Sequence, residues 1–555
     1  MNRQRLTALM AGLTALALAS SAGVAAAAPL GPDGVATGTA TAASTANVGD
    51  WATWQKDIVG SRFNPNETKI TPASVGRLKL KWAYAYPFLN ELQRIGSQPA
   101  VVGGVLYVGS PDAKLLALDA KTGATRWTFD TVPVAGPWDP SDFSTLNIIR
   151  DGPAVAGGRV YFADSRGWLY ALRQDTGTLI WATKLDTHPK VWITSSPLVY
   201  KGHVIIGISS TESGITDPNY PCCTHRGSIV SVDANTGAIV WRHYTLPPPQ
   251  LVGTWASGSE KWEPSGGMVW GSGVIDPVNN TLFIGTGNNH SGSGGDIDSL
   301  LALDPATGNL KWKQQFTPQD TLNEWCTQPT LPPEEYCPWK AAGYGLNYDV
   351  GATPNVFVAN GRRMVGVGQK GGVFHAMDAK TGAIVWETRL AAEDRTARDP
   401  GSVGIPWGSS YDGTRIYAAS WRGNPGTLYA LDPATGRILW GTPLPADACT
   451  TGGAAAYQNL CEPTMDPAAT STPGLVYEGA GDGKMRIYSA DSGQILWTFD
   501  TIRDFQGVNG LVGHGRSIGA NGGAVIANGM LYIQAGYYPL YPLGGHGTVL
   551  LAFGL

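Results

Sequence analysis

The sequence predicts an all-β fold: an eight-bladed β-propeller with Trp-docking repeats, in which the N- and C-terminal strands share one blade. Three observations support this prediction. One phrase repeats along the chain, a second hairpin precedes each copy, and the composition favours short strands. The 555 residues include 73 Gly and 38 Pro, and only 15% of them are charged. Long surface helices need charged outer faces, whereas short strands joined by tight turns need glycine.

The repeated phrase is a strand ending in Ala/Ser-x-Asp, followed by a Thr-Gly turn and by a Trp four residues after the glycine, as in LLALDAKTGATRW. This is hairpin-turn chemistry, because Gly adopts positive φ and Asp accepts backbone hydrogen bonds. The last copy, IYSADSGQILW, has a shortened turn. The copies end at Trp127, Trp181, Trp241, Trp312, Trp386, Trp440 and Trp497.

A second hairpin, such as AVVGGVLYVGS or AVAGGRVYFAD, precedes each phrase, so each unit holds four strands. Four strands with a fixed Trp are typical of a propeller blade. The N-terminal LKLKWAYAY carries an eighth Trp, Trp82, without preceding strands, and the C-terminal GTVLLAFGL supplies a matching strand without a Trp. We therefore expect the two termini to complete one blade and leave no open edge. A seven-bladed ring with a stray N-terminal strand is the alternative.

The first 48 residues differ from the rest. Residues 1–28 combine a basic start with an apolar, small-residue run, which predicts a signal peptide, and residues 29–48 predict a flexible linker. The propeller is expected over 49–555. A membrane anchor is the alternative for the apolar run, although its Ala/Gly/Ser-rich second half makes a poor span. We expect a secreted or periplasmic chain with no membrane span once processed. The net charge of −4 gives no sign of the excess basic charge that is typical of nucleic-acid-binding proteins.

Export permits disulfides, and the chain has six cysteines. Cys222 and Cys223 are adjacent. The other four form two pairs that are each close enough in sequence to close a single loop, Cys326 with Cys337 and Cys449 with Cys461. No CxxCH motif occurs in the sequence, which excludes a covalently attached c-type haem.

Candidate site residues lie in the enlarged units between Trp181 and Trp386, since added length in a repeat maps to loops on the binding face. They are Glu212, Asn288, Asp349 and Lys370, and Asp349 is expected to open a strand. The three oxygen-bearing side chains suit Ca²⁺, with an anionic cofactor or water supplying further ligands. Taken singly, each has a plainer interpretation as a solvated carboxylate, turn residue, loop cap or hairpin cation, and Trp270 as blade packing.

From residue 49 onward the chain resembles the pyrroloquinoline quinone (PQQ) dependent alcohol dehydrogenases. The segments DWATWQKDIVGSRFNPNETKI and CCTHRGSIVSVDANTG resemble the polyvinyl alcohol dehydrogenase branch. Family members place a Trp eighteen residues before a metal-binding Asn, as Trp270 and Asn288 stand here. They place a Thr eighteen residues before a metal-binding Glu, as Thr194 and Glu212 stand here. The family's T-P-x-D segment matches TPQD at 317–320, before Asp349.

The resemblance implies a role for each matched residue. Asp349 is the catalytic base, and the Ca²⁺ ligands are Glu212, Asn288 and Asp349. The PQQ-binding residues are Trp270 beneath the ring, Lys370 at the quinone oxygens, Arg150 at a PQQ carboxylate, Thr194, and the pair Cys222 and Cys223.

Two departures from the family pattern refine this expectation. The small-alcohol enzymes place a vicinal cysteine pair just before the Arg, where this chain has Ser144 and Thr145. The pair at Cys222–Cys223 is expected to cover the cofactor from another blade, and its displacement argues against a small-alcohol substrate. Lanthanide-dependent members carry a second Asp two residues after the catalytic one, where this chain has Gly351, so Ca²⁺ is expected.

The implied function is an exported PQQ- and Ca²⁺-dependent dehydrogenase. It oxidises secondary or polymeric alcohols to ketones or aldehydes and passes electrons to an external acceptor such as a cytochrome c. The alternative is a non-catalytic propeller of the same repeat type that binds protein or polysaccharide.

Overall fold

The computed structural model describes residues 49–89, 95–140, 146–323, 346–392, 403–422, 425–519, 523–536 and 547–555. All of them belong to one compact unit, Ala42–Leu555. The predicted signal peptide and linker lie outside the described residues, as do Cys326 and Cys337. Within the described ranges, no helix is long and apolar enough to cross a membrane.

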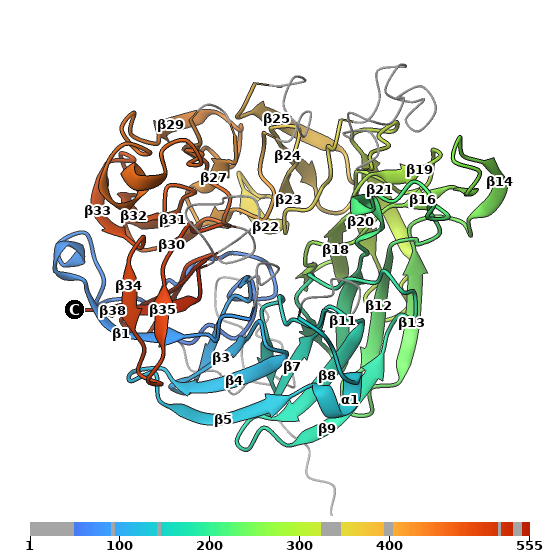
Figure 1. Cartoon of the computed structure of the whole chain (residues 1–555). Helices are drawn as coiled ribbons and strands as arrows, with labels where there is room; N and C mark the ends of the chain where they lie inside the picture. The colour runs from blue at the N-terminus through green and yellow to red at the C-terminus, as the bar shows by residue number, and fades with distance from the viewer. Residues whose placement is uncertain are drawn as a thin grey trace, which may run out of the picture. The chain divides into compact units, whose positions relative to one another are not determined.

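The described residues form eight four-stranded antiparallel sheets that follow one another along the chain (Figure 1). Blades 1 and 2 consist of β2 (Ala100–Val102), β3 (Val105–Gly109), β4 (Lys114–Asp119), β5 (Thr125–Asp130), and β6 (Ala154–Ala156), β7 (Arg159–Ala163), β8 (Trp168–Arg173), β9 (Leu179–Lys184). Blades 3 and 4 consist of β10 (Leu198–Tyr200), β11 (His203–Ile208), β12 (Ser228–Asp233), β13 (Ile239–Tyr244), and β17 (Val274–Asp276), β18 (Thr281–Gly285), β20 (Ser299–Leu303), β21 (Leu310–Gln315).

The next three blades repeat the pattern. Blades 5 and 6 consist of β22 (Asn355–Ala359), β23 (Arg362–Gly368), β24 (Val373–Asp378), β25 (Ile384–Arg389), and β26 (Ser410–Tyr411), β27 (Ile416–Ser420), β28 (Thr427–Leu431), β29 (Ile438–Pro443). Blade 7 consists of β30 (Thr470–Thr472), β31 (Leu475–Gly479), β32 (Lys484–Ser489) and β33 (Ile495–Asp500). Every sheet runs in simple meander order, so the first strand of each blade has one strand neighbour within its sheet.

Blade 8 joins the two ends of the chain. Its strands are β36 (Val525–Ala527), β37 (Met530–Ala535), β38 (Val549–Gly554) and, as the fourth, β1 (Lys79–Ala85). β1 pairs antiparallel with β38 from Lys79 opposite Gly554 to Ala85 opposite Val549. The eight-bladed prediction with shared termini is confirmed, and the seven-bladed alternative is wrong, because the N-terminal strand is a full member of the last sheet.

A tryptophan on the fourth strand of one blade packs against the turn of the next blade. The indole of Trp127 donates a hydrogen bond to the carbonyl of Gln174 at 3.2 Å. A Cβ added to Gly177, which has φ of +70°, would lie 2.5 Å from the Trp127 ring. Glycine is therefore required here both by the backbone conformation and by the close approach of the indole.

The same joint recurs around the ring. Trp82, Trp181, Trp241, Trp386 and Trp440 donate to the carbonyls of Ala120, Ala234, Pro305, Pro433 and Ala490. The glycines that lie under successive indoles are Gly123, Gly177, Gly237, Gly308, Gly382, Gly436 and Gly493. Trp82 of β1 docks on blade 1, so the shared blade takes part in the same series of joints.

The joint between blades 7 and 8 is different, because the C-terminal strand has no Thr-Gly turn. Trp497 packs edge-on against Phe553 with 5.5 Å between ring centroids, and Phe499 does so at 4.7 Å. Between the other blades the core combines aliphatic and aromatic side chains from facing sheets, and Leu169 of β8 and Ile206 of β11 belong to one such cluster. Buried apolar layers of this kind hold each pair of sheets together.

The remaining elements lie outside the eight four-stranded sheets. Three two-stranded sheets pair β14 (Gln250–Thr254) with β15 (Glu260–Glu263), β16 (Ser265–Gly266) with β19 (Asn289–Ser291), and β34 (Asp504–Gln506) with β35 (Val512–His514). Short helical turns are η1 (Val75–Arg77), α1 (Val132–Ala135), η2 (Glu212–Gly214) and η4 (Gly452–Tyr457). The loop that contains η4 is closed by a disulfide between Cys449 and Cys461, as their spacing predicted.

Replacing Gly177 by Ala tests the tryptophan joint. We expect destabilisation from two sources, a left-handed backbone cost of about 1 kcal/mol and a clash with Trp127 of about 1–3 kcal/mol. The matched control is Gly157→Ala, because Gly157 also has positive φ, +58°, but has no atom within 4 Å of the added Cβ. Denaturant unfolding measures both variants, and equal losses would show that the approach of Trp127 contributes nothing.

Candidate active site

Three of the predicted site residues occupy the same place in consecutive blades. Arg150, Thr194 and Trp270 each lie four residues before the first strand of their blade, β6, β10 and β17. The Thr194 hydroxyl donates to the Trp270 carbonyl at 2.9 Å. In an antiparallel hairpin, the start of the first strand and the end of the second lie at the same end. Glu212 follows β11 and Asn288 follows β18, so these residues all belong to one face.

A ladder of hydrogen bonds joins the segments that lead into these first strands. The amide of Gly152, two residues after Arg150, donates to Ser196 Oγ at 2.8 Å. The amide of Ser196 in turn donates to the Oγ of Ser272, two residues after Trp270, also at 2.8 Å. All three linked residues are buried. Blades 2, 3 and 4 are therefore held in a fixed relation where Arg150 and Trp270 lie.

The Asp349 carboxylate is the point at which four predicted residues meet. Its Oδ1 accepts from the Asn288 amide at 2.7 Å, and its Oδ2 accepts from Trp270 Nε1 at 3.2 Å and from Lys370 Nζ at 2.8 Å. Lys370 Nζ also donates to Asn347 Oδ1 at 3.0 Å. The Asp349 residue is only 5% exposed. Donors from blades 4 and 5 thus orient one nearly buried carboxylate.

Two glycines allow this close approach of blades 4 and 5. A Cβ on Gly351 would lie 1.8 Å from the ring of Trp270, and a Cβ on Gly287 would lie 2.7 Å from Asp349 Oδ1. Neither clash is relieved without moving the indole or the carboxylate, since real Cβ atoms do not pack so closely. The two positions therefore have to be glycine for Trp270 and Asp349 to touch.

The indole of Trp270 is supported by groups from two other blades. Trp407, which precedes β26, packs edge-on against it at 4.9 Å between ring centroids. Lys370 Nζ lies 5.0 Å from the centroid of the Trp270 ring, within cation–π distance. The sequence did not identify Trp407 as a site residue, because no repeat position or spacing distinguishes it from the other tryptophans outside the repeats.

The prediction that Asp349 opens a strand is wrong. The strand β22 begins at Asn355, six residues later. The Asp349 carbonyl accepts from the Lys370 amide at 3.0 Å, and the amide of Val350 donates to the Thr286 carbonyl at 3.0 Å. These backbone groups therefore bond to loops at the ends of β23 and β18 rather than to a neighbouring strand. Asp349 thus lies in the segment that precedes β22.

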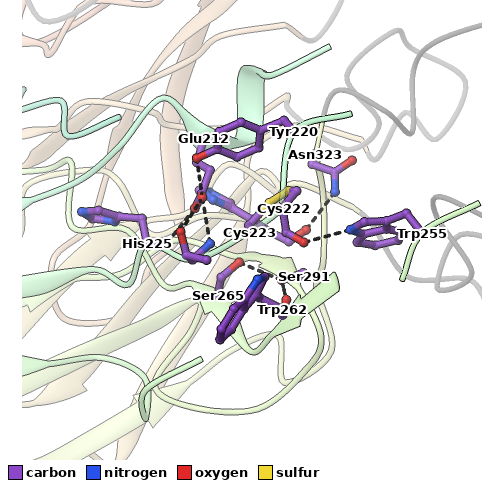
Figure 2. Close-up of a disulfide and its surroundings, with 12 residues drawn as sticks. Glu212, Tyr220, Cys222, Cys223, His225, Trp255, Trp262, Ser265, Ser291 and Asn323 are labelled. Atoms are coloured by element: carbon purple, nitrogen blue, oxygen red, sulfur yellow. Dashed lines mark hydrogen bonds between the residues drawn. A yellow bond between two sulfur atoms is a disulfide. The ribbon is translucent and has the colours of Figure 1, made fainter. Parts of the chain in front are cut away.

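Glu212 is fully buried and its carboxylate is held by a loop of its own blade. Oε1 accepts from the Tyr220 hydroxyl at 3.0 Å and from the Thr224 amide at 2.7 Å, while Oε2 accepts from the His225 amide at 2.8 Å. Figure 2 shows these donors converging on Glu212. Among the contacts of the described residues, Glu212 makes no hydrogen bond to Asp349, so we treat it as a neighbouring half of the site.

Cys222 and Cys223 are joined by a disulfide and lie in the same loop, between the donors to Glu212 (Figure 2). Both are buried. The hairpin β14–β15 covers them, because Trp255 Nε1 and the Trp262 amide both donate to the Cys222 carbonyl, at 2.9 and 3.2 Å. The vicinal pair thus connects the Glu212 loop to an added hairpin outside the four-stranded blades.

Backbone hydrogen bonds connect the Glu212 half to the Asp349 half. The carbonyl of His225, whose amide binds Glu212, accepts from the Gly266 amide at 3.0 Å. The next residue, Gly267, donates to the Asn288 carbonyl at 2.8 Å. Because the Asn288 amide binds Asp349, one continuous set of short contacts links the three predicted metal ligands.

His290 interacts electrostatically with the carboxylates of both Glu212 and Asp349. It was not predicted as a site residue, because the eight histidines of the sequence lack the spacing of metal ligands. It is 2% exposed, and burial lowers its pKa to about 4, although Glu212 and Asp349 both act to raise it. The imidazole is therefore neutral at pH 7. Its Nδ1 is buried and has no hydrogen-bond partner among the described residues.

Asp320 holds the segment that carries Asp349. Its Oδ1 accepts from the amides of Leu346 and Asn347 at 2.8 and 3.2 Å, and its Oδ2 accepts from the amide of Tyr348 at 2.6 Å. Burial, with a further contribution from Asp349, raises the pKa of Asp320 to about 6. The TPQD motif was the only sequence signal for Asp320. The motif did not predict that Asp320 binds three backbone amides.

A third carboxyl group, Asp298, lies in the same buried region. Burial raises its pKa well above the usual range, and the negative charges of Asp320 and Asp349 add to this shift. The shift favours the protonated form of this group. Across the described residues, no set of three or more His, Cys, Asp and Glu side chains has the arrangement of a metal site. A metal at this face would need amide and non-protein oxygens as well.

Comparison with known proteins identifies the family of this chain. Residues 51–332 match the family described as "Glucose/ethanol/alcohol dehydrogenase, beta-propeller domain", and residues 298–406 and 369–530 match one described as "Outer membrane protein assembly factor BamB". The chain is 31% identical over 530 residues to a polyvinylalcohol dehydrogenase of Pseudomonas sp, covering 91% of this chain and 76% of the relative. It is 30% identical over 506 residues to a polyvinylalcohol dehydrogenase of Sphingopyxis sp., covering 88% and 72%.

Solved structures share the fold at lower identity. The quinohemoprotein alcohol dehydrogenase ADHIIG of Pseudomonas putida superposes with a TM-score of 0.66 and 21% identity, covering 92% of this chain and 80% of that one. A europium-containing methanol dehydrogenase gives a TM-score of 0.65 and 19% identity, covering 92% and 98%. Taken together with the match over 51–332 and the relatives at 30% identity or more, the chain belongs to the PQQ-dependent alcohol dehydrogenase family.

Proposed function

We propose that this chain is an exported PQQ- and Ca²⁺-dependent dehydrogenase that oxidises secondary or polymeric alcohols, such as polyvinyl alcohol, to ketones or aldehydes. Electrons then pass to an external acceptor such as a cytochrome c. The observation that carries the proposal is the Asp349 carboxylate, held at once by Trp270, Asn288 and Lys370. The names of the two relatives above support the polymeric substrate, and the basic, apolar residues 1–28 support export.

The residues present fit a flat, anionic quinone. Trp270 offers an aromatic ring, and the close approaches at Gly287 and Gly351 fix that ring against the Asp349 segment. The Lys370 ammonium group lies 5.0 Å from the Trp270 ring centroid and the Thr194 hydroxyl binds the Trp270 carbonyl, so a cation and a hydroxyl are available for the oxygens of the cofactor. We assign PQQ binding to Trp270, Lys370, Arg150, Thr194 and the Cys222–Cys223 pair.

The donor set at this face also fits Ca²⁺. Glu212 and Asp349 supply carboxylate oxygens and Asn288 supplies an amide oxygen, which are the hard ligands that Ca²⁺ prefers. Three protein groups are fewer than the usual six to eight, so the remaining ligands come from PQQ and water. When bound, the quinone accepts the two electrons of the alcohol, and Ca²⁺ makes it a better acceptor as a Lewis acid.

Asp349 is the group placed to take the alcohol proton. A general base has to be ionised, oriented and within hydrogen-bond reach of the hydroxyl. The Asn288 amide and the Trp270 indole orient the carboxylate, and Lys370 Nζ at 2.8 Å compensates its charge. Asn347 binds the same ammonium group and so fixes where that charge lies. The alcohol hydroxyl proton moves to Asp349 as the substrate is oxidised.

Asp349→Asn tests this role. The variant keeps the shape of the side chain but cannot accept the proton, so we expect kcat to fall by at least about 10³-fold, within the range for a lost general base. PQQ binding should persist. A dye-linked alcohol oxidation assay after reconstitution with PQQ and Ca²⁺ measures turnover. Asp491→Asn is the control, since its carboxylate is 81% exposed and pairs with Arg415 on another blade; unchanged activity in Asp349→Asn would refute the assignment.

Glu212→Gln tests the metal site separately. The amide keeps one oxygen acceptor for the Thr224 and Tyr220 donors but removes the charge that favours a divalent cation. We expect the Ca²⁺ concentration needed for half-maximal reconstitution to rise by at least about tenfold, with little change in kcat at saturating Ca²⁺. Calcium titration with PQQ present measures this shift. A titration curve that overlies the wild-type curve would exclude Glu212 as a ligand.

Asp320→Asn tests whether the segment before Asp349 is held by its three amide contacts. The substituted amide has one carbonyl oxygen in place of two, so at least one of the bonds to residues 346–348 is lost. A displacement of Asp349 by about 1 Å lowers kcat by about 10²-fold. KM and the thermal midpoint should change much less, and a parallel loss of stability and kcat would instead indicate a purely structural role.

A further inference from the structure

The segment 51–64, which we call the axial cord, binds the free edges of the first strands. In six blades the second residue of the first strand donates its amide to the cord. The donors Val101, Val155, Ile275, Val356, Tyr411 and Ser471 bind the carbonyls of Trp51, Ala52, Ile58, Val59, Ser61 and Arg62 at 2.6–3.0 Å. In blade 8 the Ile526 carbonyl accepts from Asn64 Nδ2 at 2.8 Å, and in blade 3 Leu198 packs with Ile58.

These edges face the axis of the ring. The first strands of adjacent blades contact one another, as β2 contacts β6, β6 contacts β10, and β22 contacts both β17 and β26. They are therefore the innermost strands, as the arrangement in Figure 1 shows. A strand edge without a partner leaves unpaired amides and carbonyls. The axial cord supplies partners for those groups, and it does so in the order of the blades, from Trp51 at blade 1 to Arg62 at blade 7.

Trp54 connects the axial cord to blades that are not neighbours in the ring. Its Nε1 donates to Thr353 Oγ1 at 3.1 Å, and its carbonyl accepts from Gln98 Nε2 at 2.8 Å and Arg62 Nη1 at 2.9 Å. On the other side, its ring lies 3.2 Å from the place where a Cβ on Gly152 would stand. Trp54 is 4% exposed. It therefore touches blades 1, 2 and 5 at once.

Arg62 fixes Trp54 from within the ring. Its guanidinium lies 5.4 Å from the Trp54 ring centroid and is fully buried. Nε donates to the Ala469 carbonyl at 3.0 Å, Nη2 to Thr470 Oγ1 at 2.8 Å, and Nη1 to Gln98 Oε1 at 2.9 Å. Burial lowers the pKa of Arg62 only to about 9, so it remains charged at neutral pH. A cation bonded to blades 1 and 7 thus supports the indole.

Both blade contacts of the Trp54 ring are close in sequence to proposed site residues. Gly152 is two residues after Arg150, and Thr353 is four residues after Asp349. Arg150 belongs to blade 2 and Asp349 to blade 5, so these two groups have to face one cofactor from different sides of the ring. The ladder through Ser196 and Ser272 connects blade 2 to blade 5 only by way of blades 3 and 4, whereas Trp54 contacts blades 2 and 5 directly.

We propose that Trp54 is a positioning residue of the active site: the hydrogen bond from its indole to Thr353 holds the Arg150 and Asp349 segments at the separation that the cofactor requires. The inference rests on the proposed PQQ site. It gives the axial cord a role in positioning the cofactor-binding segments, in addition to its role in pairing the free strand edges. None of the cord residues needs to touch the cofactor for this role.

The test measures PQQ affinity by equilibrium binding to the metal-loaded protein, at a temperature where every variant is folded. Trp54→Phe removes the indole donor, and Thr353→Val removes the same bond from the acceptor side. We expect each to raise the PQQ dissociation constant about three- to tenfold, which corresponds to one hydrogen bond. The double variant should bind no more weakly than the weaker single variant, and Thr353→Ser, which keeps the hydroxyl, should bind as the wild type does.

Trp51→Phe is the matched control. Trp51 is also fully buried in the axial cord and lies 5.7 Å from the Arg62 guanidinium, but its Nε1 has no hydrogen-bond partner among the described residues. This variant should lower the thermal midpoint while leaving the PQQ dissociation constant within about twofold of the wild type, as expected for a loss of packing alone.

The outcomes separate the two proposals. If wild-type protein binds PQQ and Trp54→Phe and Thr353→Val bind it equally well, the positioning role is refuted while the proposed function stands. If Trp51→Phe weakens PQQ binding as much as Trp54→Phe does, the effect is general packing and the inference is also refuted. Failure of the wild type itself to bind PQQ overturns the proposed function, and the inference with it.

Discussion

The contact between a tryptophan of one blade and a glycine turn of the next is the interaction on which the ring depends. It combines an indole hydrogen bond to a backbone carbonyl with a surface that only glycine leaves open, as for Trp127 on Gly177. Because the same contact recurs at successive joints, successive blades turn through similar angles, and the eighth sheet arrives where the first one begins. Trp82 on β1 makes this joint with blade 1, and an aromatic cluster around Phe553 replaces it between blades 7 and 8.

This regularity explains how distant residues form one site. Arg150, Thr194 and Trp270 take equivalent places before the first strands of blades 2, 3 and 4, and the loops after the second strands of neighbouring blades carry Glu212 and Asn288. The chemistry therefore varies by substitution at fixed positions, while the fold supplies only the convergence. What is irregular in the chain lies at the same face: the disulfide loop, the hairpin β14–β15 and the segment before Asp349, which Asp320 secures through three amides.

The sequence patterns predicted the features that depend on side-chain identity. The tryptophan phrases predicted the blades and their closure, and the family resemblance at Trp270, Asn288, Asp349 and Lys370 identified residues that meet at the Asp349 carboxylate. Features made by backbone groups could not be foreseen. The axial cord binds strand edges through its carbonyls and leaves no repeat, and Asp320 binds amides whose own side chains are unrelated. The placement of Asp349 ahead of β22, rather than at the start of a strand, depends on close approaches at Gly287 and Gly351 that only the folded chain reveals.

The pairing of β1 with β38 has a consequence for how the chain reaches its native state. β1 lies at Lys79–Ala85 and its partner β38 at Val549–Gly554, so β38 is synthesised long after β1. Until those residues are available, β1 and β37 each present an unpaired edge that can join another chain. A contact of such sequence separation also forms slowly. A chain that lacks only β38 would therefore form an open, aggregation-prone arrangement of blades, and it would not behave as a slightly smaller enzyme.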